Sequence, residues 1–232
     1  RNCNDIMVIE FVSIAYGMTE TSPVSFQCVK DDPFEKRTTT VGRVHPHVEV
    51  KVIDEHGKIV KRGEKGEICT RGYSVMLKYW NDPEKTKETI DDQGWVHSGD
   101  LGVLDDEGYL EIVGRVKDMI IRGGENIFPK EIENHLLTHP DILDAQIIGV
   151  EDENMGEEIM ACIILENPDK IVTRDDVKDY CQGEIAHFKI PKYIRIVTEF
   201  PLTVTGKVKK NEMRADANKI LKEVNPDLWE VE

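Results

Sequence analysis

The sequence has no apolar run close to the ~20 residues that a membrane-spanning helix needs, and it has no excess of basic charge. Lys and Arg number 30 against 45 Asp and Glu, so the formal net charge of the 232 residues is −15 at pH 7. This charge argues against a nucleic-acid partner, whose phosphates require a basic face. We therefore expect no transmembrane segment and no nucleic-acid binding, and the sequence points to no protein partner.

Closely spaced cysteines are also missing, because no two of the five stand at the spacing of a zinc motif. Their odd number and wide separation predict reduced thiols in an intracellular compartment and no zinc site. The chain begins with Arg1 and not with Met, so we expect that its true start, with any targeting segment, lies upstream. The cysteines are Cys3, Cys28, Cys69, Cys162 and Cys181.

The first half of the chain has the pattern of short antiparallel strands. A run of β-branched residues from 48 to 60 is interrupted by His56-Gly57, which is a hairpin signal. A second pair of strand-like segments is separated by the acidic run 105–107 and Gly108, which indicates a turn. Short strands joined by glycine turns favour a small β-barrel-like subdomain or an antiparallel sheet.

The second half alternates helices and strands. Pro129 stands at the first position of a predicted helix, and Thr173 is a predicted N-cap of another. We place the boundary between Arg115 and Asp118, which gives an α+β chain with a β-rich domain 1–115 and a small α+β domain 118–232. The predicted helices are 129–140, 173–184 and 211–221, and the predicted strands are 119–121, 145–150, 159–165 and 193–197.

Four separated motifs occur in this order: YGMTE (16–20), HSGD (97–100), GRVKDMIIRGGENIFPKEIE (114–133) and PLTVTGKVKK (201–210). Together they resemble the later core motifs of the adenylate-forming superfamily, the AMP-dependent synthetases and ligases. Within it, RGGENIFPKEIE, MGEE and HFKIPKYI most resemble the medium-chain acyl-CoA synthetases, acyl-CoA synthetase family member 2. The resemblance covers almost the whole chain and implies a C-terminal fragment. The family's Ser/Thr/Gly-rich loop ending in Pro-Lys, which holds the ATP β- and γ-phosphates, is absent from this sequence.

The resemblance assigns nucleotide-binding roles to the first motif. It implies that Tyr16 stacks on adenine, that Thr19 donates to the α-phosphate and that Glu20 binds Mg²⁺. An oxygen ligand suits such a hard cation. Gly17 permits a tight backbone where a ligand lies close. The residues alone leave open a simple strand-end turn with an exposed glutamate.

The next two motifs imply ribose binding and a hinge. Asp100, expected in a loop at a strand edge, accepts hydrogen bonds only and suits the two hydroxyls of a ribose. Ser98 stands where the family usually has threonine, and either residue supplies a hydroxyl. Arg115 offers a planar fork of donors to the ribose and adenylate side of the site. Lys117 matches the family's hinge position. A turn-capping aspartate and a solvated charged turn are the alternatives.

The resemblance places the catalytic lysine and the CoA tunnel in the second half. Lys207 would reach the substrate carboxylate and the α-phosphate, where its ammonium counters the charge on the transferring phosphoryl group. Gly123, Gly124 and Glu125, expected between a strand and a helix, would line the pantetheine tunnel; otherwise they form a plain turn. The alternative for Lys207 is a surface lysine in a basic cluster with Lys209 and Lys210. We also expect a local basic patch that could attract the CoA phosphates, and simply solvated lysines are its alternative. The patch comprises Lys189, Lys192, Lys209 and Lys210.

The implied function is ATP-dependent acyl-CoA synthesis: a carboxylic acid, ATP and CoA give acyl-CoA, AMP and pyrophosphate. Mg²⁺ is the required ion, and no tightly bound organic cofactor is expected. The resemblance favours medium-chain fatty acids and the mitochondrial matrix. An aryl-acid ligase, a carrier-protein adenylation domain and a non-catalytic nucleotide-binding module remain alternatives, and the isolated chain is expected to be inactive.

Overall fold

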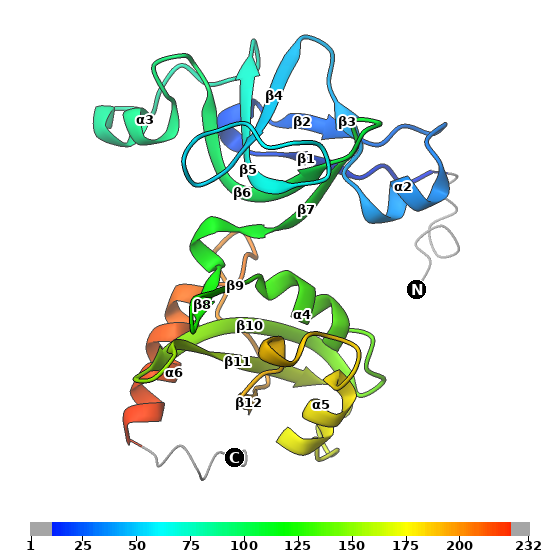
Figure 1. The fold of residues 1–232 in the computed structure, drawn as a ribbon, viewed down its shortest axis with the longest axis vertical. Helices are drawn as coiled ribbons and strands as arrows, with labels where there is room; N and C mark the ends of the chain where they lie inside the picture. The colour runs from blue at the N-terminus through cyan, green and yellow to red at the C-terminus, as the bar shows by residue number, and fades with distance from the viewer. Residues whose placement is uncertain (1–10, 224–232) are drawn as a thin grey trace. The chain divides into compact units, whose positions relative to one another are not determined.

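The structure is a computed structural model that describes residues 11–223. The chain forms two compact units, Arg1–Val116 and Lys117–Glu232 (Figure 1). Each unit combines helices with mainly antiparallel strands, which confirms the α+β class. In the described part, the helices are too short or too polar to cross a bilayer. Cys3 lies outside the described residues.

The N-terminal unit is built on an antiparallel sheet of four strands paired in chain order, β4-β5-β6-β7. Within residues 11–223, no strand pairing joins β4 to β7, so the sheet does not close into a barrel. The β7 edge is covered in part, because Leu110 exchanges backbone hydrogen bonds with Val41 and Gly42. The strands are β4 (Val48–Ile53), β5 (Lys65–Gly72), β6 (Val96–Leu104) and β7 (Leu110–Arg115).

β6 contains a bulge that the sequence did not reveal. Glu67 pairs with Leu101 and Cys69 pairs with His97, so one intervening residue of β5 faces three of β6. Gly99, in the middle of the bulge, has φ +67°, a conformation that glycine adopts at low cost. Asp100, the next residue, lies within β6 and not in the loop that we expected.

A three-stranded antiparallel sheet packs against the larger one within this unit. Its central residue Phe26 is fully buried in a cluster with Ile68 of β5 and Leu110 of β7. Tyr16 packs against the same cluster, so the first motif is anchored to the four-stranded sheet. The three strands are β1 (Ala15–Gly17), β2 (Val24–Gln27) and β3 (Arg43–Val44). The helices of this unit are η1 (Thr19–Thr21), α2 (Phe34–Thr39) and α3 (Pro83–Thr89).

The C-terminal unit has a five-stranded sheet with helices on both faces. Adjacent residues of β10 point to opposite sides: Ile147 packs with α4 and α5, whereas Ile148 packs with α6. β11 lies between β10 and β8, and β12 joins it in parallel. The elements are η2 (Val116–Asp118), β8 (Ile120–Arg122), β9 (Glu125–Ile127), α4 (Pro129–Leu136), β10 (Ile142–Asp152), β11 (Gly156–Leu165), α5 (Arg174–Cys181), η3 (His187–Lys189), β12 (Tyr193–Ile196) and α6 (Lys210–Glu223).

The predicted helices of this unit are present, with shifted ends. The first ends at Leu136, and Thr173 caps the second by accepting a hydrogen bond from the backbone N–H of Asp176. One element was missed: β9 follows the glycine pair, so Gly123 and Gly124 join two strands and do not join a strand directly to a helix.

Candidate functional site

The carboxylate of Asp100 is the centre of the polar cluster formed by the first three motifs. The hydroxyl of Tyr16 donates to Asp100 Oδ2 at 2.8 Å, and Arg115 Nε lies 2.7 Å from Asp100 Oδ1. Tyr16 lies in β1, Asp100 in β6 and Arg115 in β7. Asp100 and Arg115 face each other because they are paired residues of adjacent strands. The carboxyl group is 16% exposed, whereas the Arg115 side chain is 44% exposed, so the guanidinium also faces solvent.

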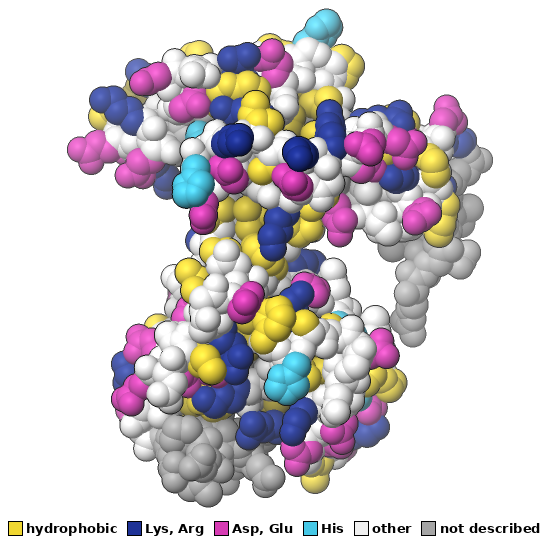
Figure 2. Space-filling model, viewed as in Figure 1, with side chains coloured by type: hydrophobic (Ala, Val, Ile, Leu, Met, Phe, Trp, Pro, Cys, Tyr) yellow, Lys and Arg dark blue, Asp and Glu magenta, His cyan; other side chains and the backbone are white. Residues whose placement is uncertain are grey.

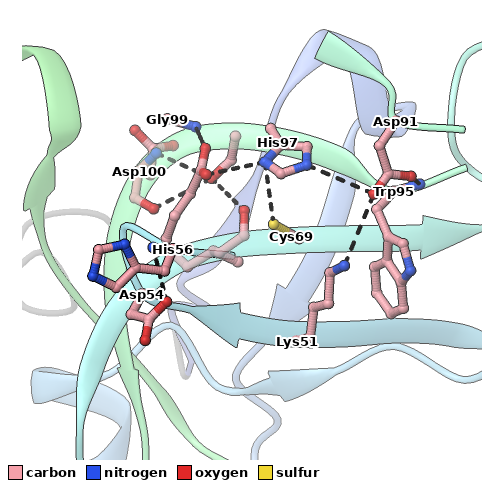
Figure 3. A network of polar contacts seen from close by, with 12 residues as sticks. Lys51, Asp54, His56, Cys69, Asp91, Trp95, His97, Gly99 and Asp100 are labelled. Atoms are coloured by element: carbon pink, nitrogen blue, oxygen red, sulfur yellow. Dashed lines mark hydrogen bonds and ion pairs between the residues drawn. The ribbon is translucent and has the colours of Figure 1, made fainter. Parts of the chain in front are cut away.

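Two further contacts fix the backbone beside Asp100. Ser98 Oγ accepts from the Asp100 backbone N–H at 3.0 Å and donates to the Ile68 carbonyl at 2.7 Å. Glu67 Oε1 accepts from the Gly99 backbone N–H at 2.9 Å (Figure 3). The bulge of β6 is thus held from both sides, which presents the Asp100 carboxylate in a defined orientation. Ser98 supplies the hydroxyl that the sequence suggested, and Glu67 was not anticipated.

The environment of Tyr16 keeps its hydroxyl protonated. Burial, together with the negative charge of Asp100, raises the pKa of Tyr16 far above its usual value. The phenol therefore remains a hydrogen-bond donor to Asp100 over the whole physiological pH range. Its ring lies 6.2 Å from that of Phe26 at an interplanar angle of 59°.

Glu20 is half-buried in η1 and is oriented by a residue that sequence reasoning missed. Tyr79 donates its hydroxyl to Glu20 Oε1 at 2.5 Å, and the Met76 backbone N–H donates to the Glu20 carbonyl at 2.9 Å. The charge of Glu20, added to burial, raises the pKa of Tyr79. Thr19, immediately before it, is exposed. Sequence reasoning missed Tyr79 because it stands 59 residues from Glu20 and no local pattern connects the two residues.

The residues around Glu20 fit Mg²⁺ held jointly with a nucleotide. Among residues 11–223, Glu20 belongs to no group of three or more His, Cys, Asp or Glu side chains that could hold an ion by themselves. Mg²⁺ commonly uses one or two carboxylates together with substrate phosphates and waters. With Oε1 held by Tyr79, Oε2 of Glu20 is the oxygen left for such an ion.

The requirement for glycine at position 17 has a structural cause that differs from the ligand contact inferred from its motif. A Cβ atom at this position would lie 1.7 Å from the backbone oxygen of Pro23. The absence of a side chain is thus required by the close approach of the segment that leads into β2, independently of any ligand. Tyr16 and Thr19 flank this contact, so it also fixes the geometry of the first motif.

Gly123 and Gly124 form the tight turn between β8 and β9. Their φ values are +58° and +87°, and the Gly123 N–H donates to the Met155 carbonyl at 2.8 Å. The turn alone explains both glycines, and beside Gly124 the space is open where a Cβ would stand. Glu125 is the exposed first residue of β9, and Lys117 is exposed in η2.

Lys207 lies at the end of a small ordered turn. The Thr203 N–H donates to the Lys207 carbonyl at 2.8 Å, and the Lys207 N–H donates to Thr203 Oγ1 at 3.0 Å. Gly206, with φ +80°, completes the turn, and Leu202 bridges to Val208. The Lys207 side chain is exposed, and in the described residues its ammonium group has no ion-pair partner.

The expectation of a basic patch is wrong, because each of the four lysines forms an ion pair with an acidic residue. The acidic partners come from other segments or from the following helix. Figure 2 shows that the face of this unit in view carries both blue and magenta side chains. The pairs are Lys189–Glu131 at 2.6 Å, Lys192–Asp152 at 2.9 Å, Lys209–Glu212 at 2.8 Å and Lys210–Glu133 at 2.5 Å.

The Lys210–Glu133 pair anchors the segment that carries Lys207. Glu133 is 8% exposed and Lys210 is 15% exposed by side chain. Glu133 Oε1 also accepts from the Ile147 N–H at 3.0 Å, and the Lys210 ammonium donates to the Ile147 carbonyl at 3.2 Å. The first residue of α6 is thereby tied to α4 and β10, three positions after Lys207.

The structure therefore brings together part of the predicted site. Tyr16, Asp100 and Arg115 meet in one cluster, and Gly17, Thr19 and Glu20 continue from its first member. The remaining candidates belong to the C-terminal unit, where they lie on two separate turns and in η2: Lys117, Gly123, Gly124, Glu125 and Lys207.

Two family models match the chain. The AMP-binding enzyme model matches residues 1–80, and the AMP-binding enzyme C-terminal domain model matches residues 131–207. The two matches fall in different compact units, and they contain the YGMTE motif and the Lys207 turn respectively.

Similar proteins align along most of this chain. The protein named medium-chain acyl-CoA ligase ACSF2, mitochondrial, from Danio rerio is 49% identical over 222 residues, which cover 95% of this chain and 36% of that protein. Its counterpart from Homo sapiens is 48% identical over 202 residues, covering 87% and 33%. The ATP-bound crystal structure of MatB from Rhodopseudomonas palustris has a TM-score of 0.83 and 36% identity, covering 90% of this chain and 41% of that one.

The chain thus spans about a third of the length of these curated relatives. Both family models, the relatives and the shared architecture agree with the motifs around Asp100 and Lys207. The chain therefore belongs to the family of AMP-binding enzymes.

Proposed function

We propose that the protein carrying this chain is an AMP-forming acid–CoA ligase that first joins a carboxylic acid to AMP and then transfers the acyl group to CoA. The observation that carries the proposal is the Asp100 carboxylate, held at 2.8 Å by Tyr16 and at 2.7 Å by Arg115 in a member of the AMP-binding enzyme family. An ionised carboxylate with both oxygens oriented is suited to accept the two hydroxyls of a ribose.

The N-terminal unit would hold the nucleotide. Asp100 accepts from the ribose, Arg115 adds its exposed guanidinium to the same side, and the Tyr16 ring stacks on adenine. Thr19 is exposed and directs its hydroxyl to the α-phosphate. Glu20 would hold Mg²⁺, and the bound ion would supply positive charge to the phosphates.

The C-terminal unit would supply the charge for the first step and the channel for the second. The exposed ammonium of Lys207 contacts the acid and the α-phosphate, where charge accumulates as the adenylate forms. Rotation about Lys117, the first residue of the unit, would then replace this lysine by the turn Gly123–Glu125 beside the CoA arm. The open space beside Gly124 leaves room for a narrow thiol chain.

Medium-chain fatty acids are the proposed substrates, and the mitochondrial matrix is the proposed compartment. The names of the relatives from Danio rerio and Homo sapiens, which are 48–49% identical to this chain, support medium-chain acids and a mitochondrial location. The matrix is proposed from the family resemblance. Free cysteines at positions 28, 69, 162 and 181, all buried, agree with a reducing compartment.

Acid-dependent exchange of radiolabelled pyrophosphate into ATP tests the proposal. The full-length protein carrying this chain is assayed with acids of increasing chain length and with aryl acids, in the presence and absence of Mg²⁺. We expect exchange that requires Mg²⁺ and is fastest with medium-chain acids. A maximum with aryl acids would reassign the substrate class. A folded protein that exchanges with no acid would instead be a non-catalytic nucleotide-binding module.

A further inference from the structure

Three potential metal ligands, none of them the predicted magnesium ligand Glu20, converge on one face of the four-stranded sheet. Glu67 and Cys69 are two residues apart on β5, so their side chains point to the same face. His97 of β6 pairs directly with Cys69 and shares that face. The β6 bulge begins at the next residue after His97. Figure 3 shows the His97 ring directed at Cys69.

The separations between the donor atoms match those of a tetrahedral site. His97 Nδ1 lies 3.0 Å from Glu67 Oε2 and 3.7 Å from Cys69 Sγ, and the three atoms lie within 4.8 Å of one another. Zinc bound to sulfur at about 2.3 Å and to nitrogen or oxygen at about 2.0–2.1 Å places ligand atoms roughly 3.3–3.6 Å apart. Shifts of a few tenths of an ångström would therefore bring the two separations from His97 Nδ1 to these values.

The surroundings provide the second layer of contacts that metal ligands usually have. The other oxygen of Glu67 accepts from the Gly99 N–H at 2.9 Å, and His97 Nε2 lies 3.7 Å from Asp91 Oδ2. Asp91 is itself fixed, because its Oδ1 accepts from the backbone N–H groups of Gln93 and Trp95. At 3.7 Å this contact is longer than a hydrogen bond, and a small closure would let the carboxylate orient the distal nitrogen of a ligating histidine and raise its basicity.

The cluster is open to ions on one side. Cys69 is fully buried, whereas the side chains of His97 and Glu67 are 30% and 22% exposed. An ion can therefore enter between the imidazole and the carboxylate, and water can take the fourth position. Among the described residues, this is the one group of three or more His, Cys, Asp or Glu side chains that meets such a distance criterion.

We propose that Glu67, Cys69 and His97 bind one divalent transition-metal ion, with Zn²⁺ as the best match. Sulfur and imidazole ligands disfavour Mg²⁺ and Ca²⁺ and suit zinc. The thiolate and the carboxylate together balance the double charge of the ion. Cysteine spacing predicted no zinc site because this one uses a single cysteine, and its partners come from two strands whose register the sequence does not state.

Cobalt titration of the metal-free 232-residue chain tests the proposal, since Co²⁺ reports tetrahedral geometry and thiolate ligation by its absorption. Cys3, which lies outside the described residues, is replaced by serine throughout. We expect one Co²⁺ per chain, visible-region bands of tetrahedral cobalt, a near-ultraviolet sulfur-to-cobalt charge-transfer band, and loss of all bands when Zn²⁺ is added.

Variants separate this site from adventitious binding. Cys69→Ala should abolish the charge-transfer band, and His97→Gln, at a partly exposed position, should remove tight binding without a change in fold. Asp91→Asn should weaken binding by about 10–100-fold. Cys28→Ser is the matched control, because Cys28 is a buried cysteine of the same unit outside the cluster, and it should bind like the parent.

Two results would overturn the proposal. One is the absence of the charge-transfer band in the folded parent at millimolar Co²⁺. The other is unchanged binding by both the Cys69 and the His97 variant. The contacts of Glu67 with Gly99 and of His97 with Asp91 would then serve only to hold the β6 bulge. Neither result bears on the ligase proposal, because the titration measures no reaction.

Discussion

Replacing Lys210 with methionine should destabilise the C-terminal unit by about 3–4 kcal/mol at pH 7. The substitution removes the counter-charge of Glu133, whose side chain is 8% exposed, while the remaining contact is the hydrogen bond from the Ile147 N–H at 3.0 Å. Breaking one side of a buried ion pair typically costs about 3–5 kcal/mol.

A second substitution separates the loss of the counter-charge from the loss of packing by Lys210. This substitution, Glu133→Gln, removes the buried charge and keeps an acceptor for the Ile147 N–H. The double variant should therefore be more stable than Lys210→Met at pH 7.

Urea titrations read out by amide hydrogen exchange in β10 and β11 measure the free energy of unfolding of this unit at pH 7. Lys209→Met is the matched control, because Lys209 pairs with Glu212 on the surface at 2.8 Å. That change should cost no more than about 0.5 kcal/mol. A cost below about 1 kcal/mol for Lys210→Met, or a double variant no more stable than Lys210→Met, would refute the assignment of a buried, charged pair.

Two further changes test other contacts. The Lys192 ammonium and backbone N–H groups lower the pKa of Asp152 to about 2, so the stabilisation by this carboxylate is complete above its unfolded-state pKa and is lost as the pH falls through 2. Asp152→Asn should cost about 1–2 kcal/mol at pH 7, allowing for the exposure of Lys192, and almost nothing near pH 2, as measured by urea unfolding. Tyr16→Phe should weaken AMP binding by the full-length protein about tenfold or more in calorimetry, because Asp100 loses a charge-assisted hydrogen bond; unchanged affinity would remove Tyr16 from the site.

Periodicity and capping signals predicted most elements of the C-terminal unit. Apolar spacing after Pro129 and the cap at Thr173 gave helices whose ends shifted by a few residues. Such signals are local, and the structure retains them because the apolar faces pack on the sheet. The strand β9 was missed because its three residues are too few to establish an alternating pattern.

Features that depend on strand register were beyond local reasoning. Asp100 lies in a bulge of β6 because of how β6 pairs with β5, and that pairing also brings Glu67 to the Gly99 N–H. The partner of Glu20 is Tyr79, from a segment with no motif. The four lysines expected to form a basic patch were misjudged for a related reason, since most of their acidic partners lie in other elements.

The most direct test of the proposed ligase mechanism separates its two half-reactions in the full-length protein with Lys207→Ala. Acid-dependent ATP–pyrophosphate exchange and thioester formation from supplied acyl-adenylate and CoA are measured side by side, with Lys209→Ala as the control. We predict that Lys207→Ala lowers exchange by about 10²–10³-fold and leaves thioester formation near the parent rate, because the ammonium serves the phosphoryl transfer alone. Equal loss in both half-reactions, or no loss in exchange, would contradict this role for Lys207.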